Sequence, residues 1–399
     1  MPAMVVFRKI LALSAAAMIL AACGSISREP FTNADLRSVQ APTGLEGLRF
    51  NGNDAAAGLA FVDRFRAQSS QRFLHGVKAL AISGGGANGA YGAGIIVGWT
   101  QSASRPDFDV VTGVSTGALT APFAFLGSKW DDELRAAYTD GEAANLTSGR
   151  LGALFLPSLF RVQPLKHLVE KHVDAELLRA VAAEHRKGRR LLVATTNLDT
   201  EETVIWDMGE IAISAERPGN EAASVELFST VLVASASIPG VFPPAVIPVQ
   251  GAGRAVSEMH VDGGVTVPFF FIPESMNLWR APDRMRPGEL YVVVNGKVGP
   301  TFGFTKGKTM AILGRSYNAM SRSQTKANLL VAQGFADRNN ATLRYTAIPD
   351  NAEASSLDFS TENMRDLFQR GFEAGRSGQA FKPLEAPPPA TPGPAPDPR

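Results

Sequence analysis

Residues 108–126 read FDVVTGVSTGALTAPFAFL, and this stretch decides the fold class. The apolar run at 108–113 predicts a buried strand, and the small apolar residues at 118–126 predict a helix. Between them, residues 113–117 form a GxSxG sequence, whose glycines permit a sharp turn from strand to helix. A serine at such a turn is presented above the edge of the sheet. Ser115 is therefore a candidate nucleophile.

The same alternation continues on both sides of this stretch. Further strands are predicted at 78–83, 191–197, 203–207, 291–295 and 344–348, and helices at 54–73, 87–99, 165–189, 225–235 and 310–335. Strands that alternate with helices predict an α/β fold with a mostly parallel sheet, which helices cover on both faces.

The composition is that of a folded globular protein. The chain has 399 residues, of which 45% are hydrophobic and 19% charged. Its 39 Lys and Arg against 38 Asp and Glu exclude a nucleic-acid partner that is bound through overall charge. A single Cys excludes an intrachain disulfide and a zinc site built from several Cys. The His, Asp and Glu residues lack the spacing of metal ligands, so we expect neither a metal nor a cofactor.

The first 22 residues have the features of a secretory signal peptide. Arg8 and Lys9 precede an apolar stretch that is shorter than the roughly 20 residues needed to span a bilayer. Leu20-Ala21-Ala22-Cys23 then resembles the lipobox of bacterial lipoproteins, which implies cleavage before Cys23 and lipidation of that residue. An ordinary signal peptide followed by an incidental cysteine is the alternative.

A lipoprotein of this kind would be attached to the cell envelope through acyl chains. Cleavage removes two basic residues, so the mature chain would be close to neutral and we expect no polybasic patch. Gly24 occupies the position where an Asp often retains lipoproteins at the inner membrane. We therefore expect the periplasmic side of the outer membrane.

The rest of the chain divides into three parts. Residues 23–50 are polar and predict a tether, and residues 51–382 have the composition of a globular domain. Eight of the residues at 383–399 are proline, which predicts a disordered tail.

A glycine-rich loop follows the predicted strand at 78–83. Gly84, Gly86 and Gly89 match the dinucleotide-binding pattern GxGxxG, but the next strand ends without the acidic residue that would bind a ribose. The loop could instead be an oxyanion site, in which backbone N–H groups point at one spot beside a helix N-terminus. A tight turn without chemistry is the third interpretation.

A hydroxyl nucleophile needs a base. His167, His172 and His185 lie in charged helical or turn stretches and are expected on the surface. His260 lies two residues before Asp262, which two glycines follow. These glycines would let the Asp262 carboxylate approach another loop closely, although an Asp-Gly turn without a catalytic role also explains them.

Together these motifs resemble the patatin-like phospholipases. The resemblance covers about residues 76–300 and rests on Gly84-Gly85-Gly86 with Gly89, GVSTG at 113–117, ASASIPGVFPP at 234–244 and Asp262-Gly263-Gly264. It implies a three-layer α/β/α fold that hydrolyses acyl esters of lipids. It also implies the roles of the site residues: Ser115 as nucleophile, Asp262 as base, and Gly84, Gly85 and Gly86 as donors to the oxyanion.

Two positions leave the mechanism open. The family usually carries Arg or Lys before the last glycine of the loop, where this chain has Asn88. His260 could complete a Ser–His–Asp triad in place of a Ser–Asp dyad. A lipoprotein that keeps this fold but binds lipid or a partner without turnover is the alternative function. Apolar segments at 154–160 and 268–273 are either core or an acyl-binding and lipid-contacting surface.

Overall fold

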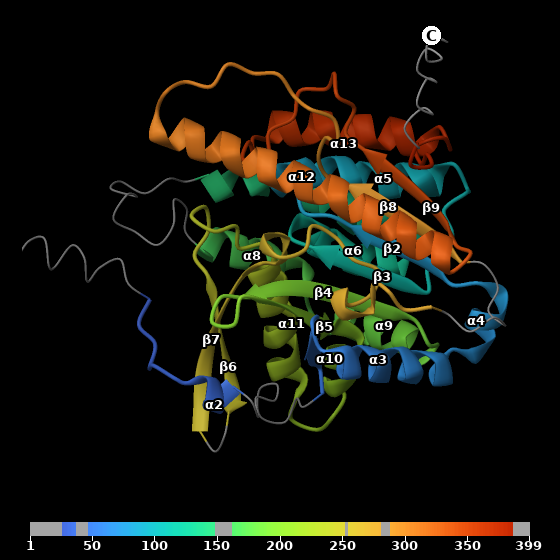
Figure 1. Ribbon diagram of the computed structural model, residues 1–399, viewed down its shortest axis with the longest axis vertical. Coiled ribbons are helices and arrows are strands. Elements are labelled where there is room, and N and C mark those ends of the chain that lie inside the picture. The colour runs from blue at the N-terminus through green and yellow to red at the C-terminus, as the bar shows by residue number, and fades with distance from the viewer. Residues whose placement is uncertain (1–25, 37–46, 148–161, 252–253, 281–287, 386–399) are drawn as a thin grey trace, which may run out of the picture.

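The computed structural model of the protein describes residues 26–36, 47–147, 162–251, 254–280 and 288–385 (Figure 1). The predicted signal peptide, Cys23, the apolar segment at 154–160 and most of the proline-rich tail lie outside these ranges. Among the helices within them, none combines the length and the apolar character needed to cross a membrane.

The described strands form a single sheet. They are β1 (Arg49–Asn51), β2 (Lys78–Ile82), β3 (Val110–Val114), β4 (Arg190–Asn197), β5 (Glu202–Asp207), β6 (Ala245–Gly251), β7 (Arg254–Asp262), β8 (Glu289–Val294) and β9 (Thr342–Ala347). The α-helices are α2 (Asn33–Leu36), α3 (Ala55–Gln68), α4 (Ser70–His75), α5 (Gly89–Gln101), α6 (Thr116–Leu126), α7 (Asp131–Thr139), α8 (Val162–His172), α9 (Ala175–Arg186), α10 (Met208–Ser214), α11 (Glu221–Ser235), α12 (Thr309–Arg338) and α13 (Thr361–Arg376).

The sheet is mostly parallel, as predicted. Its strand order is β1-β5-β4-β3-β2-β8-β9, and the pairs β4–β3, β3–β2, β2–β8 and β8–β9 are parallel. β5 and β1 extend one edge in antiparallel orientation, and the hairpin of β6 and β7 joins β4 through antiparallel pairing. Because parallel strands end at the same edge, the residues that follow β2, β3 and β8 lie close together.

Helices cover both faces of the sheet, which confirms the three-layer α/β/α fold (Figure 1). The larger core lies between one face and helices that include α5, α6, α9, α11 and α13, with Ile95, Phe125 and Phe228 fully buried there. On the other face, α3 contributes Phe61 to a second cluster, and the end of α12 contributes Leu329 to a third. Burying both faces removes the apolar strands from water, and this is the main stabilising term for such a sheet.

Helices α5 and α13 cross at very short range because glycines line their contact. A Cβ on Gly94 or Gly98 would overlap a backbone carbonyl of α13, and a Cβ on Gly371 or Gly375 would overlap a carbonyl of α5. In each helix the two glycines are four residues apart and therefore lie on one face. Each pair thus allows the other backbone to approach.

Two predicted helices are interrupted in the structure. The segment predicted as one helix at 165–189 is α8 followed by α9, because the Asp174 carboxylate accepts the N–H of Leu177 at 2.8 Å and begins a new helix. The segment at 54–73 is divided into α3 and α4 at Ser69. The other predicted helices and strands are confirmed, with shifts of a few residues at their ends.

The described part of the predicted tether lies against the sheet. The Arg28 guanidinium donates to both carboxylate oxygens of Asp199, at 2.7 and 2.9 Å, and to the carbonyl of Ser257 at 2.9 Å. Arg254 in β7 pairs with Asp35 at 2.9 Å. Residues 26–36 are thus fixed to the β4–β5 turn and to the β6–β7 hairpin.

Candidate active site

Ser115 occupies the turn between β3 and α6, as the GxSxG sequence predicts. Its backbone has φ 58° and ψ −129°, an unfavourable conformation for a residue with a side chain. The backbone N–H of Ser115 donates to the hydroxyl of Ser235 at 2.9 Å, and that hydroxyl donates to the carbonyl of Ala194 at 2.7 Å. Ser235 therefore connects the turn to the end of α11 and to β4.

Asp262 lies beside Ser115, although 147 residues separate the two in the sequence. The Ser115 hydroxyl donates to Asp262 Oδ2 at 2.5 Å, and the N–H of Gly264 donates to Oδ1 at 2.7 Å. The backbone of Asp262 is fixed by the pairing of β7 with β4 and by a hydrogen bond from its N–H to the carbonyl of Ser237 at 3.0 Å. Both carboxylate oxygens are thus held in position.

Burial changes the acidity of this carboxyl group. Asp262 is 2% exposed, and the loss of hydration raises its pKa from 3.8 to about 7. The hydrogen bonds from Ser115 and from the Gly264 N–H favour the ionised form, but they only partly offset the effect of burial. A carboxylate with a pKa near neutrality can accept a proton from a hydroxyl far more readily than one in water.

The glycine loop lies directly against the nucleophile. A Cβ on Gly84 would lie 3.0 Å from Cβ of Ser115, a tighter contact than most, so a side chain there would push the loop away from Ser115. The N–H of Gly84 donates to the carbonyl of Pro268 at 3.3 Å. In the described part of the chain, no acceptor is bound by the N–H groups of Gly85 and Gly86. Of the three predicted donors, these two are free to bind an oxyanion.

Asn295 supports the glycine loop, and the sequence analysis missed it. It follows β8, next to the end of β2, and its side-chain amide donates to the carbonyl of Ser83 at 2.8 Å. The Ser83 hydroxyl accepts the N–H of Asn295 at 2.9 Å and donates to the carbonyl of Gly84 at 2.8 Å. The sequence does contain a signal for this role, because Asn295 is a polar residue at the end of the buried apolar run YVVVN.

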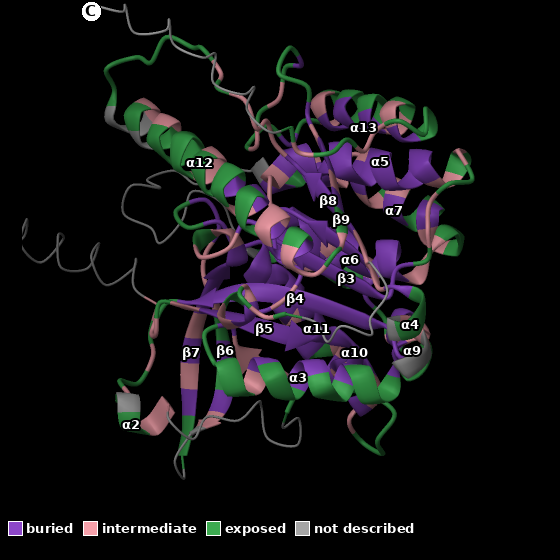
Figure 2. Cartoon of the chain, turned by 45° about the vertical axis from the view of Figure 1, so that its right-hand side comes forward, coloured by how far each residue is buried: buried purple, intermediate pink, exposed green. Residues whose placement is uncertain are grey.

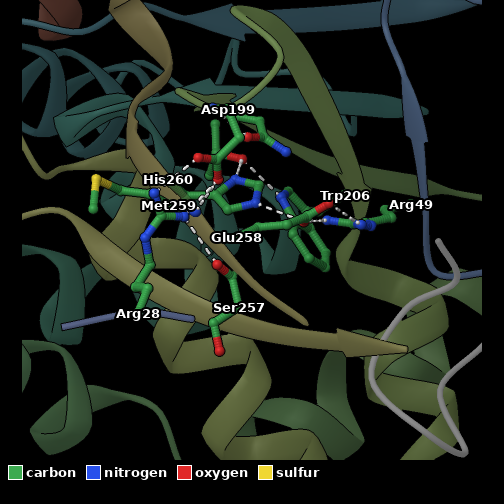
Figure 3. Close-up of polar contacts among 10 residues, drawn as sticks. Arg28, Arg49, Asp199, Trp206, Ser257, Glu258, Met259 and His260 are labelled. Carbon is green, nitrogen blue, oxygen red and sulfur yellow. Dashed lines mark hydrogen bonds and ion pairs between the residues drawn. The ribbon is translucent and has the colours of Figure 1, made fainter. Parts of the chain in front are cut away.

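His260 is committed to a separate network (Figure 3). Trp206 Nε1 donates to Thr195 Oγ1 at 2.9 Å, so the Thr195 hydroxyl hydrogen is available to His260 Nδ1, also at 2.9 Å. His260 Nε2 then carries the proton and donates to Glu258 at 3.0 Å, and Arg49 pairs with the same carboxylate at 2.6 Å. Both ring nitrogens are occupied, and neither contacts the nucleophile or its carboxylate.

The charge states of this network follow from burial. Burial lowers the pKa of His260, so the ring is neutral near pH 7. Burial alone would raise the pKa of Glu258, but hydrogen bonds from His260 and Arg49 outweigh it and lower that pKa to about 2. The geometry therefore favours the dyad over the triad that the sequence left open.

The expectation that His185 is a surface residue was wrong. It is 3% exposed, with Nδ1 3.7 Å from Asp207 and Nε2 3.2 Å from Glu210. His167 is exposed, as predicted, and His172 is half-buried. His185, Asp207 and Glu210 are close enough to be considered as metal ligands. One ligand atom from each of the three lies within 4.8 Å of the other two, a grouping that the sequence analysis missed.

A narrow apolar cavity begins beside the nucleophile. Its lining includes Gly86 of the glycine loop, Thr116 next to Ser115, and the apolar side chains of Leu119, Phe123 and Val169 from α6 and α8. Its volume is about 60 Å³. Pockets that enclose a whole small molecule measure roughly 300–1,000 Å³, so this cavity is suited to part of a flexible apolar chain.

The apolar segment at 268–273 belongs to the core. Phe269, Phe270 and Phe271 are between 0 and 9% exposed and pack against the sheet and α12. Core packing is confirmed for the three phenylalanines. Because residues 268–272 also line a cavity of about 220 Å³, the acyl-binding interpretation of this segment stays a prediction.

Comparison with known proteins finds a similarity for the central part of the chain. The family model of patatin-like phospholipase matches residues 80–271, which include the glycine loop, Ser115 and Asp262. This segment, slightly less than half of the chain, is similar to that family. The similarity supports lipid acyl hydrolase activity in general. β8, β9, α12 and α13 lie beyond the matched residues and complete the sheet and layers of the patatin-like fold.

One solved structure similar to this chain is the crystal structure of VipD from Legionella pneumophila. The sequences are 12% identical, and the similarity covers 77% of this chain and 68% of that chain with a TM-score of 0.36. No curated protein matches the sequence significantly.

Proposed function

We propose that the protein is a serine hydrolase of carboxylic esters in lipids, with Ser115 and Asp262 as a catalytic dyad. The observation that carries this proposal is the hydrogen bond of 2.5 Å from the Ser115 hydroxyl to the buried Asp262 carboxylate. A protein of this fold that only bound lipid would have no need of a strained serine beside a carboxyl group whose pKa is about 7.

The reaction proceeds in two halves. Ser115 Oγ attacks the ester carbonyl carbon while its proton passes to Asp262 Oδ2, and the N–H groups of Gly85 and Gly86 stabilise the negative oxygen. The tetrahedral intermediate expels the alcohol, which takes the proton from Asp262, and leaves an acyl group on Ser115. A water molecule that gives its proton to Asp262 then attacks the acyl group. Its collapse releases the fatty acid and returns the proton to Ser115 Oγ.

The apolar cavity supports a substrate with an acyl chain. Because its lining includes Gly86 and Thr116, part of an acyl chain would enter it while the ester carbonyl oxygen stays near the glycine loop. Polar head groups would remain outside, toward solvent. The proposed substrates are therefore esters of fatty acids. They include phospholipids, whose acyl ester bonds the enzyme would cleave as a phospholipase A does.

We further propose that Cys23 is lipidated and attaches the protein to the periplasmic side of the outer membrane. The support is the signal-like segment at 1–22 and the lipobox-like sequence at 20–23. Labelling cells with palmitate tests this: label is expected on the wild type and not on Cys23→Ser. Label that persists in Cys23→Ser would contradict it.

Release of free fatty acid from phospholipid vesicles tests the proposed activity. The wild type is expected to release fatty acid, whereas Ser115→Ala and Asp262→Asn should each lower the rate by at least about a thousandfold. Circular dichroism confirms that the variants are folded. Release that survives Ser115→Ala would contradict the mechanism. A folded wild type that hydrolyses none of several esters would instead support lipid binding without turnover.

A further inference from the structure

Basic residues are concentrated in one stretch of this nearly neutral chain. Residues 295–336 contain no Asp or Glu but six Lys and Arg, namely Lys297, Lys306, Lys308, Arg315, Arg322 and Lys326. The rest of the sequence has 33 basic residues against 38 acidic ones. Among the ion pairs of the described residues, none involves any of these six. The near-neutral net charge of the chain thus conceals a local excess of basic residues.

The same stretch exposes large apolar side chains. Phe302 is 98% exposed and Phe304 is 90% exposed, and Met320 in α12 is 69% exposed. Among the α12 side chains that the structure describes, the first buried one is Thr325. Figure 2 shows the first half of α12 largely exposed, whereas its second half contacts the sheet. Isolated exposed apolar residues are ordinary, but several close together mark a surface with a partner.

The apolar and basic side chains form two adjacent stripes. At about 100° per residue, Ile312 and Met320 lie on one side of α12, and Arg315, Arg322 and Lys326 lie on a neighbouring side. Arg315 donates to the carbonyl of Thr301, and Arg322 to that of Gly299 at 3.3 Å. These bonds hold the loop with Phe302 and Phe304 beside the helix. We call residues 302–308 and 309–326 together the docking surface.

The docking surface and the active site lie on the same side of the molecule. Tyr317, one turn before Met320, is partly shielded from solvent. This shielding, and secondarily the charge of Asp262, raise its pKa to about 12. Figure 1 shows the start of α12 on the same side of the molecule as β7, the strand that ends at Asp262. A partner on this surface would therefore lie on the same side of the molecule as the nucleophile.

We propose that the docking surface binds a lipid bilayer that contains anionic lipids. Phenylalanines insert at the boundary between head groups and acyl chains, and lysines beside them are attracted to anionic head groups. A second copy of the chain fits less well, because a two-fold contact would bring the same six cations face to face. The proposal rests on the proposed function in that the bilayer then supplies the ester substrate.

Vesicle binding tests the proposal without hydrolysis. The parent protein is the full chain with Cys23→Ser, which prevents acylation, and Ser115→Ala, which prevents hydrolysis. It is sedimented with vesicles of ether-linked phosphatidylcholine, either alone or with 30% ether-linked phosphatidylglycerol. Lys306→Glu/Lys308→Glu and Phe302→Ser/Phe304→Ser are each compared with this parent. The matched controls are Lys129→Glu/Arg376→Glu, at exposed positions outside the docking surface, and Leu278→Ser, which is 82% exposed beside the far end of α12.

The parent should bind the anionic vesicles at least tenfold more tightly than the neutral ones. Each docking-surface pair should lower binding to the anionic vesicles at least tenfold, and the controls less than twofold. With Ser115 restored, hydrolysis of a soluble short-chain ester should be unchanged in both pairs.

Equal binding to the two kinds of vesicle, or equal binding by the pairs and the controls, would overturn the proposal. A dimer that dissociates in Phe302→Ser/Phe304→Ser, seen by light scattering, would also overturn it and assign the surface to a second copy. Absence of ester hydrolysis with vesicle binding intact would instead refute the proposed function alone.

Discussion

The hydroxyl of Ser235 accepts the backbone N–H of Ser115 at 2.9 Å and donates to the carbonyl of Ala194 at 2.7 Å. The Ser235 hydroxyl is thus the hydrogen-bond acceptor of the Ser115 backbone N–H. Because Ser115 has φ 58°, its backbone is costly to hold and depends on such contacts. Ser235 is thus a positioning residue for the catalytic turn.

Ser235→Ala should lower kcat for a soluble ester by about 10- to 100-fold, because small displacements of a reacting group are costly. It leaves a buried N–H without an acceptor, so stability should fall by about 1–3 kcal/mol. Ser237→Ala is the matched control, since that hydroxyl bonds to the carbonyl of Val233, close to it in the chain. If the two variants had the same kcat, Ser235 would have no positioning role.

The rate should depend on pH through Asp262. Only the ionised carboxylate accepts the proton of Ser115, so kcat/KM for a soluble ester should rise from pH 5, reach half of its maximum near pH 7 and level off above about pH 8. A pH–rate profile measures this, with circular dichroism at each pH as the control for folding. A midpoint near 4 would mean that Asp262 is hydrated and ordinary in the folded enzyme.

Asp262 should also make stability depend on pH. Its pKa is raised on folding, so its contribution to stability is fully present below 3.8 and is lost as pH rises through about 7. The difference corresponds to at most about 4 kcal/mol. Asp262→Asn removes this titration and should therefore gain stability relative to the wild type between pH 4 and 8.

Urea unfolding at the two pH values measures this gain. The same substitution at Asp63, whose side chain is 74% exposed, should show little change between them. A gain of Asp262→Asn that is equal at pH 4 and pH 8 would argue against a raised pKa.

His260→Gln should separate the dyad from the triad. His260 contacts Thr195 and Glu258 and not the nucleophile, so kcat should stay within about tenfold of the wild type. Stability should fall by about 1–3 kcal/mol, because the buried Glu258 loses a donor. Ester hydrolysis and urea unfolding give the two values. A loss of kcat as large as that of Asp262→Asn would restore the triad.

Gly98→Ala should destabilise the protein by several kcal/mol, because the new methyl group overlaps the carbonyl oxygen of Phe372 and separates α5 from α13. Gly314→Ala in α12 is the control: nothing lies within 4 Å of its Cβ position, so it should gain about 0.5–1 kcal/mol of helix propensity. Thermal unfolding compares the two. Equal effects would mean that the helices do not need to approach so closely.

Local sequence predicted the centre of the site well. The turn at Ser115 and the loop at Gly84–Gly86 each follow a short apolar strand, and parallel strands end at one edge, so their proximity follows from the pattern. The sequence pattern did not predict which of the three glycines has a backbone N–H that is already bonded. This depends on the carbonyl of Pro268, which lies far along the chain.

Features that depend on distant partners were not predictable. His185 lies in a basic run and reads as exposed, but it is buried beside Asp207 and Glu210, which lie 22 and 25 residues away in the sequence. The β6–β7 hairpin carries Asp262, yet Pro248 within it weakens the pattern of a strand. Helix α13 was also missed, although its paired glycines match those of α5 and could have indicated a helix contact.

The ion pair of Arg28 with Asp199 sets a limit on where the proposed anchor can be. Cys23 is five residues before Arg28, and an extended chain covers roughly 3.5 Å per residue, so the lipid would be within about 17 Å of that ion pair. The connection from Cys23 to Arg28 is then a short tether and not a long spacer. A tether of this length would keep the domain at the bilayer to which it is attached, so that it could not reach the lipids of a facing membrane.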